Sequence, residues 1–316
     1  MANSLTLAGY SVVYDLKASD IDIILLTDPR RFANITFGPG GAYRYILLKN
    51  PSAIIVHRVN ECDERKQTNF INKLLVRANY IADHTVFISQ WLKSLPIWEN
   101  IKDYSIILNG ADSDLYFPNQ QNKWTKEKPL KLVTHHWSNN SFKGIDIYME
   151  IDKLIGTDEW KNKISFTYIG NLSKDLKLKN TEIIPPLSGR QLRDKLSEMD
   201  VYVTGSINEP AGMHHIEGAL CGLPLLYRRS GALPEYCNQF GVSFCKKEDF
   251  CDSLISIMKD YNRFKKEIKR YNNTANNMNR GYIDLFKTLL AERADLIKKR
   301  RKKINIYLKA QNLISF

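Results

Sequence analysis

The sequence predicts an α/β protein in which two doubly wound, parallel-sheet domains face each other across a cleft. Short apolar segments alternate with helical stretches in both halves of the chain. Several of these segments are apolar throughout, which is typical of parallel strands covered by helices on both faces. The chain has 316 residues, a length that fits about two domains.

The N-terminal half contains the first alternating series. Its strand-like segments are residues 10–14, 21–26, 53–57, 84–88 and 104–108, and helical patterns lie at residues 66–82 and 90–95. The Gly-Pro-Gly-Gly sequence at residues 38–41 is interpreted as a plain turn, with a phosphate-binding loop as the alternative. The polar segment 109–128 breaks the alternation and is interpreted as an interdomain linker.

A second alternating series follows this linker. The predicted strands are residues 130–134, 164–169, 181–184, 201–204, 224–227 and 242–244, and the predicted helices are residues 145–155, 188–199, 214–221 and 248–268. From residue 272 onward the pattern is that of an amphipathic helix. The predicted domains are therefore two Rossmann-like domains, residues 1–118 and 119–271, and a basic helical tail, residues 272–316, that can pack back on the first domain.

Composition excludes several classes of protein. No segment approaches the ~18 uncharged apolar residues of a membrane-spanning helix, and residues 1–8 lack the basic start of a signal peptide. The five cysteines are odd in number and form no Cys-x-x-Cys pair, so we expect reduced thiols in the cytoplasm. Because the net charge of +12 includes the basic run from Lys298 to Lys303, we expect either a solvated helix face or peripheral contact with an anionic membrane.

The most informative segment runs from Glu209 to Glu217 and reads Glu-Pro-Ala-Gly-Met-His-His-Ile-Glu. A predicted strand leads into a loop, and a helix begins near Met213. The first amides of a helix have no intrahelical partners and its dipole favours anions, while Gly212 lets a ligand approach the backbone closely. Two carboxylates on either side of such a helix start suit a ligand with an anionic centre and polyhydroxyl ends. A nucleotide sugar is a ligand of this kind.

Other motifs stand at consistent distances around this segment: Ile-Leu-Asn-Gly-Ala-Asp at residues 107–112, Tyr-Phe-Pro at 116–118, Lys-Gly at 143–144, Gly-Leu-Pro at 222–224 and Gly-x-x-Pro-Glu at 231–235. In this order they resemble the retaining glycosyltransferases of family 4 (group 1 glycosyltransferases), over roughly residues 5–250. The resemblance implies the two-domain GT-B fold. It also implies retaining, metal-independent transfer of a sugar from a UDP- or GDP-linked donor to a hydroxyl of a glycan or of a lipid-linked or protein-linked acceptor. No cofactor is expected beyond this nucleotide-sugar substrate.

The resemblance assigns roles to single residues. Glu209 would hold hydroxyl groups of the donor sugar, and Glu217 would hold the ribose. The amides of Gly212 and Met213 would hold the phosphates or the sugar, and the ammonium group of Lys143 would neutralise the diphosphate.

A histidine at a strand end extends this predicted site. His57 ends an apolar predicted strand, where the family places an active-site histidine facing the donor sugar. The alternative is a hydrogen-bonded strand-end histidine without a catalytic role. The loop that follows is unusually polar, which suits an acceptor site.

The chain departs from the family pattern in two places. The family usually has an arginine a few residues before the Lys-Gly pair, but residues 134–142 contain none, and His135, His136 or Asn139 is expected to take its place. The chain also begins within the helix that follows the first strand of the family. The N-terminal domain is therefore expected to lack that strand, and residues 304–308 are the one spare strand-like segment.

Three alternatives remain open at this point. A catalytically degenerate nucleotide-sugar-binding protein would keep the pocket without turnover. A basic nucleic-acid-binding protein would fit the charge, but no helix-turn-helix, zinc-finger or RNA-binding sheet motif accompanies it, so no specific nucleic acid is expected. His135 and His136, with His214 and His215, form a possible four-histidine metal site, although the predicted site contains no metal.

Overall fold

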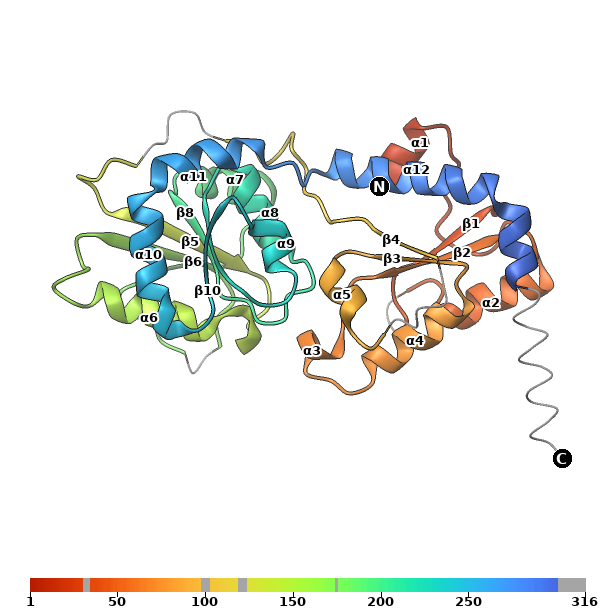
Figure 1. The fold of residues 1–316 in the computed structure, drawn as a ribbon, viewed down its shortest axis with the longest axis horizontal. Helices are drawn as coiled ribbons and strands as arrows, with labels where there is room; N and C mark the ends of the chain where they lie inside the picture. Colours follow the sequence, from red (N-terminus) through yellow and green to blue (C-terminus); the bar gives the residue numbers. More distant parts are fainter. Residues whose placement is uncertain (31–34, 98–102, 119–123, 174–175, 301–316) are drawn as a thin grey trace. The chain divides into compact units, whose positions relative to one another are not determined.

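The computed structural model describes residues 1–30, 35–97, 103–118, 124–173 and 176–300. The described chain forms two compact units. The N-terminal unit comprises Met1–Leu108 together with the residues from Met278 onward, and the C-terminal unit comprises Asn109–Asn277. Each unit is a parallel β-sheet with helices on its faces (Figure 1). The predicted fold class of two parallel-sheet α/β domains is confirmed.

The described sheet of the N-terminal unit has the strand order β1-β2-β3-β4, with β1 (Ile23–Leu26), β2 (Ile54–Val59), β3 (His84–Phe87) and β4 (Tyr104–Ile106). All neighbouring strands are parallel. Side chains along a strand alternate between its two faces. Ile55 accordingly packs with α2 (Pro39–Leu48), whereas Ile54 and Val56 pack against α12 (Ala275–Ala291). Helix α4 (Ile71–Ile81) contacts α2 and β2.

The structure corrects three details of the N-terminal prediction. Residues 10–14 are not a strand, and because no sheet buries them Val13 and Tyr14 stay exposed. Residues 38–41, predicted as a turn, contain the start of α2, where Pro39 fits because the first N–H groups of a helix lack intrahelical partners. The predicted helix 66–82 is interrupted at Gln67, which adopts a left-handed φ of 54° between α3 (Asp63–Lys66) and α4.

The C-terminal unit has the strand order β10-β9-β8-β5-β6-β7. Its strands are β5 (Leu130–His136), β6 (Ile164–Gly170), β7 (Glu182–Ile184), β8 (Val201–Thr204), β9 (Leu225–Arg228) and β10 (Gly241–Phe244). The direction of the strand order reverses between β5 and β8. Open parallel sheets bind ligands at the carboxyl ends of the strands at such a switch point.

Helices cover this second sheet at the predicted places, except for α9, which overlaps the Gly-x-x-Pro-Glu motif and was not predicted as a helix. They are α6 (Ile145–Ile155), α7 (Gly189–Ser197), α8 (Met213–Leu220), α9 (Leu233–Cys237), α10 (Phe250–Lys259) and α11 (Tyr261–Glu267). Helix α6 has the predicted bounds and buries Ile147, Tyr148 and Ile151 in the same core as Leu132 and Phe166 of the sheet. The predicted helix 248–268 is divided between α10 and α11.

The two units divide after Leu108 and after Asn277, whereas the predicted boundaries fall after residues 118 and 271. Two segments of the C-terminal unit that are distant in sequence run side by side near these points. The backbone N–H of Ala111 donates to Asn273 O (3.2 Å), and the N–H of Ala275 donates to Ala111 O (2.7 Å). A Cβ atom at Gly110 would lie 2.1 Å from Thr274 O, so only glycine allows this approach.

The described part of the basic tail packs on the N-terminal unit. Residues 293–300 are helical, and the guanidinium group of Arg300 forms an ion pair with Asp83 and donates to Ala53 O at 2.6 Å. Lys299 pairs with Asp103 at 2.9 Å. The predicted basic residues 301–303 and the spare strand-like segment 304–308 lie outside the described residues. Among the helices that the structure describes, none is long and apolar enough to cross a membrane.

Candidate active site at the switch point of the C-terminal sheet

The candidate site forms where β5 and β8 end. Gly144, which has a left-handed φ of 97°, packs directly on Gly205 after β8; a Cβ atom at Gly144 would lie 2.4 Å from the Gly205 backbone. This close approach joins the loop before α6 to the loop before α8. As a result, two predicted site residues that are distant in sequence lie together: Lys143 Nζ is 3.2 Å from Glu209 Oε2.

The Glu209 carboxylate is held in a defined position. Its side chain is 4% exposed, and that of Lys143 is 18% exposed. The backbone carbonyl of Glu209 accepts the N–H of Ala232 at 2.8 Å. At Gly231, which has a φ of 61°, a Cβ atom would lie 2.4 Å from Glu209 N. Glu209 therefore depends on the turn after β9, which the predicted Gly-x-x-Pro-Glu motif supplies.

Helix α8 begins directly beside this ion pair. Gly212 is its N-cap and has no side chain with which to cap the first turn, so the first amides can bind an anion. A Cβ atom at Gly212 would lie 2.4 Å from His214 Nδ1 and 3.1 Å from the Glu209 carboxyl carbon. Only glycine fits between these groups. Met213, the first residue of the helix, is 38% exposed.

Glu217 lies one turn further along α8 and is bound by His135. Tyr202 explains the orientation of the His135 ring, because its hydroxyl accepts the backbone N–H of His135 and lies 3.1 Å from His135 Nδ1. Burial raises the pKa of Tyr202 well above its ordinary value, so the hydroxyl keeps its proton. Because a carboxylate oxygen only accepts, the Nε2–H of His135 donates to Glu217 Oε2 at 2.7 Å.

Tyr116 is a second group beside Glu217. The sequence motifs predict no role for this tyrosine. Burial, followed by the Glu217 carboxylate, raises the pKa of Tyr116, so its hydroxyl stays protonated and can donate. Tyr116 belongs to the predicted Tyr-Phe-Pro motif, which was the available sequence signal. Tyr202 carried no comparable signal, because a tyrosine within an apolar strand is typical of a core.

The other histidines near the switch point are buried among aromatic rings. His136 Nε2 is 2.7 Å from the Tyr148 hydroxyl, and His214 Nε2 is 3.0 Å from Thr204 Oγ1. Burial lowers the pKa of His214 well below its ordinary value and that of His215 to about 4, so both are neutral near pH 7. Within the described ranges there is no group of three or more His, Cys, Asp or Glu side chains placed to hold a metal ion.

Two predicted site residues lie outside these contacts. Asn139 is exposed in the loop after β5. His57 lies in β2 of the N-terminal unit, is fully buried, and places Nδ1 2.5 Å from Asn79 Oδ1. Because an amide oxygen only accepts, Nδ1 carries the proton of this hydrogen bond. The arrangement resembles the hydrogen-bonded alternative, and a catalytic role for His57 stays a prediction.

Part of this chain is similar in sequence to known glycosyltransferases. Residues 154–278 match the family model described as glycosyl transferases group 1. The chain is 23% identical over 205 residues to the gpi3 subunit of phosphatidylinositol N-acetylglucosaminyltransferase of Schizosaccharomyces pombe, an alignment that covers 60% of this chain. The chain spans 44% of the length of that relative. Both similarities support the predicted glycosyltransferase class.

Solved structures confirm the two-domain GT-B fold. Sucrose-phosphate synthase from Thermosynechococcus elongatus superposes with a TM-score of 0.65 at 13% identity, covering 85% of this chain and 74% of its own. The HepE protein of Anabaena, in complex with UDP-glucose, superposes with a TM-score of 0.55 at 13% identity, covering 88% of this chain and 76% of its own.

Proposed function

We propose that this chain transfers a sugar from a nucleotide-sugar donor to a hydroxyl acceptor, with retention of configuration and without a metal ion. The observation that carries the proposal is the pairing of Glu209 with Lys143 and of Glu217 with His135 on either side of the start of α8. These groups suit the three parts of such a donor. Glu217 would bind the ribose hydroxyls, Lys143 and the first amides of α8 would bind the diphosphate, and Glu209 would bind the sugar.

The ion pair between Lys143 and Glu209 compensates two opposite charges within the candidate site. Each charge neutralises the other, with Glu209 buried and Lys143 partly exposed. An arriving diphosphate would compete for the ammonium group of Lys143, and sugar hydroxyls would then donate to Glu209. Positive charge beside the leaving diphosphate would promote its departure, so that positioning and electrostatics supply most of the rate.

The names of similar proteins support a donor and an acceptor class. HepE is described in complex with UDP-glucose, and the pneumococcal O-GlcNAc transferase GtfA in complex with UDP and GlcNAc. These structures favour a UDP-linked donor over a GDP-linked one. The gpi3 relative is named as a subunit of a phosphatidylinositol N-acetylglucosaminyltransferase, which supports a lipid-linked acceptor.

A nucleotide-sugar screen tests this proposal. A ligand that binds only the native state raises the melting temperature, so UDP- and GDP-sugars should be ranked by thermal stabilisation. The best donor should then be hydrolysed or transferred, and Glu209→Gln should lower this turnover by about 100-fold, the scale of losing one transition-state contact. Nucleoside diphosphate affinity should stay equal or increase, because Lys143 loses its charged partner.

Two outcomes would contradict the enzymatic proposal. Stabilisation by a donor without any hydrolysis or transfer would favour the catalytically degenerate binder. A loss of nucleoside diphosphate affinity in Glu209→Gln as large as the loss of turnover would show that Glu209 does not act on the sugar.

We also propose that the basic tail holds the enzyme at an anionic membrane surface. Arg300 cannot contribute, because its side chain is 9% exposed and paired with Asp83. Lys298 is exposed, and residues 301–303 complete the basic run.

Each basic residue near an anionic surface contributes about 1 kcal/mol to membrane binding. Charge-neutralising Lys298 and residues 301–303 should therefore weaken vesicle binding at least tenfold at low salt. Co-sedimentation with phosphatidylserine vesicles measures this, and equal binding of the neutralised and native chains would contradict it.

A further inference from the structure

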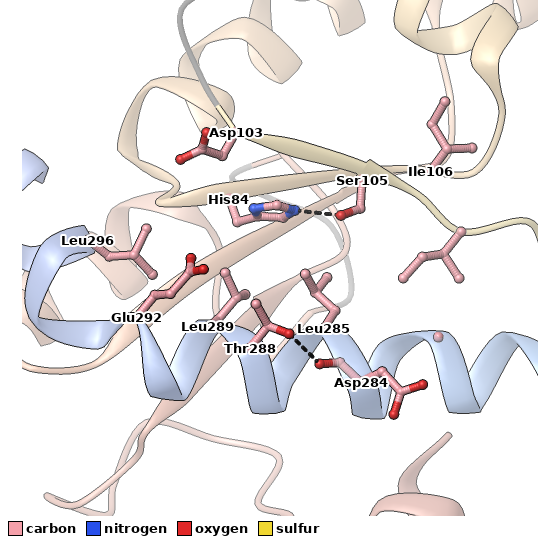
Figure 2. Close-up of a pocket in the computed structure, with 12 residues that line it drawn as sticks. His84, Asp103, Ser105, Ile106, Asp284, Leu285, Thr288, Leu289, Glu292 and Leu296 are labelled. Carbon is pink, nitrogen blue, oxygen red and sulfur yellow. Dashed lines mark hydrogen bonds between the residues drawn. The ribbon is translucent and has the colours of Figure 1, made fainter.

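A pocket of about 410 Å³ lies in the N-terminal unit beneath α12, beside β3 and β4 (Figure 2). His84 is the first residue of β3 and Asp103 directly precedes β4, so the polar end of the pocket lies at the amino ends of these strands, while Ile106 and Ile107 line it further along. Ligands of open α/β sheets bind at the opposite, carboxyl ends. Its volume is within the ~300–1,000 Å³ typical of small-molecule sites. The pocket shares no residue with the candidate active site, which belongs to the C-terminal unit.

His84 gives this pocket an unsatisfied polar atom. The residue is 6% exposed, and its Nε2 lies 2.9 Å from Ser105 Oγ. Its Nδ1 is buried and has no hydrogen-bond partner within the described part of the chain. Burial lowers the pKa of His84 to about 4, so the ring is neutral near pH 7. An unpaired buried acceptor costs about 1–3 kcal/mol, which a donor from a ligand would recover.

The pocket combines negative charge with an apolar wall. Figure 2 shows the Glu292 carboxylate pointing toward His84, with Asp103 on the other side of the ring. Lys299 neutralises Asp103 by pairing with it. The carboxylates of Glu292 and Asp284, which also line the pocket, leave its surface negatively charged, although the chain as a whole has a net charge of +12. The adjoining wall is formed by the leucines of the C-terminal helical segment, Leu285, Leu289 and Leu296.

We propose that this pocket binds a primary ammonium group carried on an apolar stem, that is, a protonated organic amine. An ammonium group has three N–H donors, and the acceptors around the pocket are His84 Nδ1, Glu292 and Asp103, whose Oδ2 also accepts from Lys299. The Nε2–H of His84 then donates to Ser105, and the stem lies along the leucine wall. A metal ion is not the fitting cation, because these side chains are not among any metal-ligating group in the described residues. A carboxylate on the same stem would be repelled.

The test uses n-hexylammonium and hexanoate, which share a six-carbon stem and differ in charge. The imidazole signals of the full chain, labelled at histidine, are followed by NMR at pH 7.5. Hexylammonium should shift the His84 signals saturably, with a Kd of a few millimolar, as expected for so small a ligand. Hexanoate should produce no saturable shift.

Paired variants identify the charges that bind the amine. Glu292→Gln should weaken hexylammonium binding about fivefold, the scale of one partly exposed charge pair. Asp295→Asn removes a charge from an exposed neighbour that does not line the pocket, so it should change the Kd less than twofold. The proposal is overturned if hexylammonium gives no saturable His84 shift up to about 20 mM, or if hexanoate binds equally well. It is also overturned if the two variants behave alike.

Discussion

Glu217→Ala should weaken the binding of a nucleoside diphosphate by about 1.5–3 kcal/mol, or roughly 10- to 150-fold. The reason is the loss of a largely buried carboxylate that would accept both ribose hydroxyl protons. In the structure that carboxylate is oriented by the Nε2–H of His135. Isothermal calorimetry measures the affinity directly, and it needs no knowledge of the acceptor.

Ligand and variant controls make this prediction specific. A 2′,3′-dideoxynucleoside diphosphate lacks the hydroxyl groups in question, so it should bind the native chain and Glu217→Ala with similar affinity. His135→Gln, which disturbs the orientation of Glu217 but keeps its charge, should cause a smaller loss. Glu198→Ala removes an exposed carboxylate of the same unit and should leave the affinity unchanged. Unchanged affinity in a folded Glu217→Ala variant would show that Glu217 does not bind the ribose.

Arg300→Met should destabilise the N-terminal unit by about 3–5 kcal/mol, the usual cost of removing one partner from a buried ion pair. The side chains of Arg300 and Asp83 are 9% and 4% exposed. Without the guanidinium group, the Asp83 carboxylate keeps the backbone N–H of Ile55 as a donor at 2.8 Å but loses its countercharge. The tail would also lose its hydrogen bonds to Pro51 O and Ala53 O.

Amide hydrogen exchange in β2 and β3 measures this loss in the N-terminal unit alone. The double variant Asp83→Asn with Arg300→Met should recover part of the stability, because it leaves no unpaired buried charge. Arg263→Met removes a comparable pair with Asp260 in which the side chains are 60% and 42% exposed, so its effect should stay below about 1 kcal/mol. A loss below about 1 kcal/mol in Arg300→Met would mean that the tail does not stabilise this unit.

Local sequence patterns determined most of the elements of the fold. The apolar segments at 130–134, 164–169 and 201–204 lie in β5, β6 and β8, and the periodic pattern at 145–155 is α6. These predictions succeed because strand and helix periodicity depends on residues close together in the chain. The loop from Glu209 to Gly212 and the helix start at Met213 follow from the same local chemistry.

The sequence by itself determined the class of fold, the six strands of the C-terminal sheet and the two glutamates that flank a helix start. Only the tertiary structure decided that Tyr202 would orient His135 toward Glu217, 82 residues away, and that Arg300 would pair with Asp83, 217 residues away. Residues 10–14 show the same limit, because an apolar pattern becomes a strand only where a sheet is present to pair with it. Such contacts depend on burial and on which backbone segments approach one another. A pattern among neighbouring residues in the sequence carries no information about burial or about such approaches.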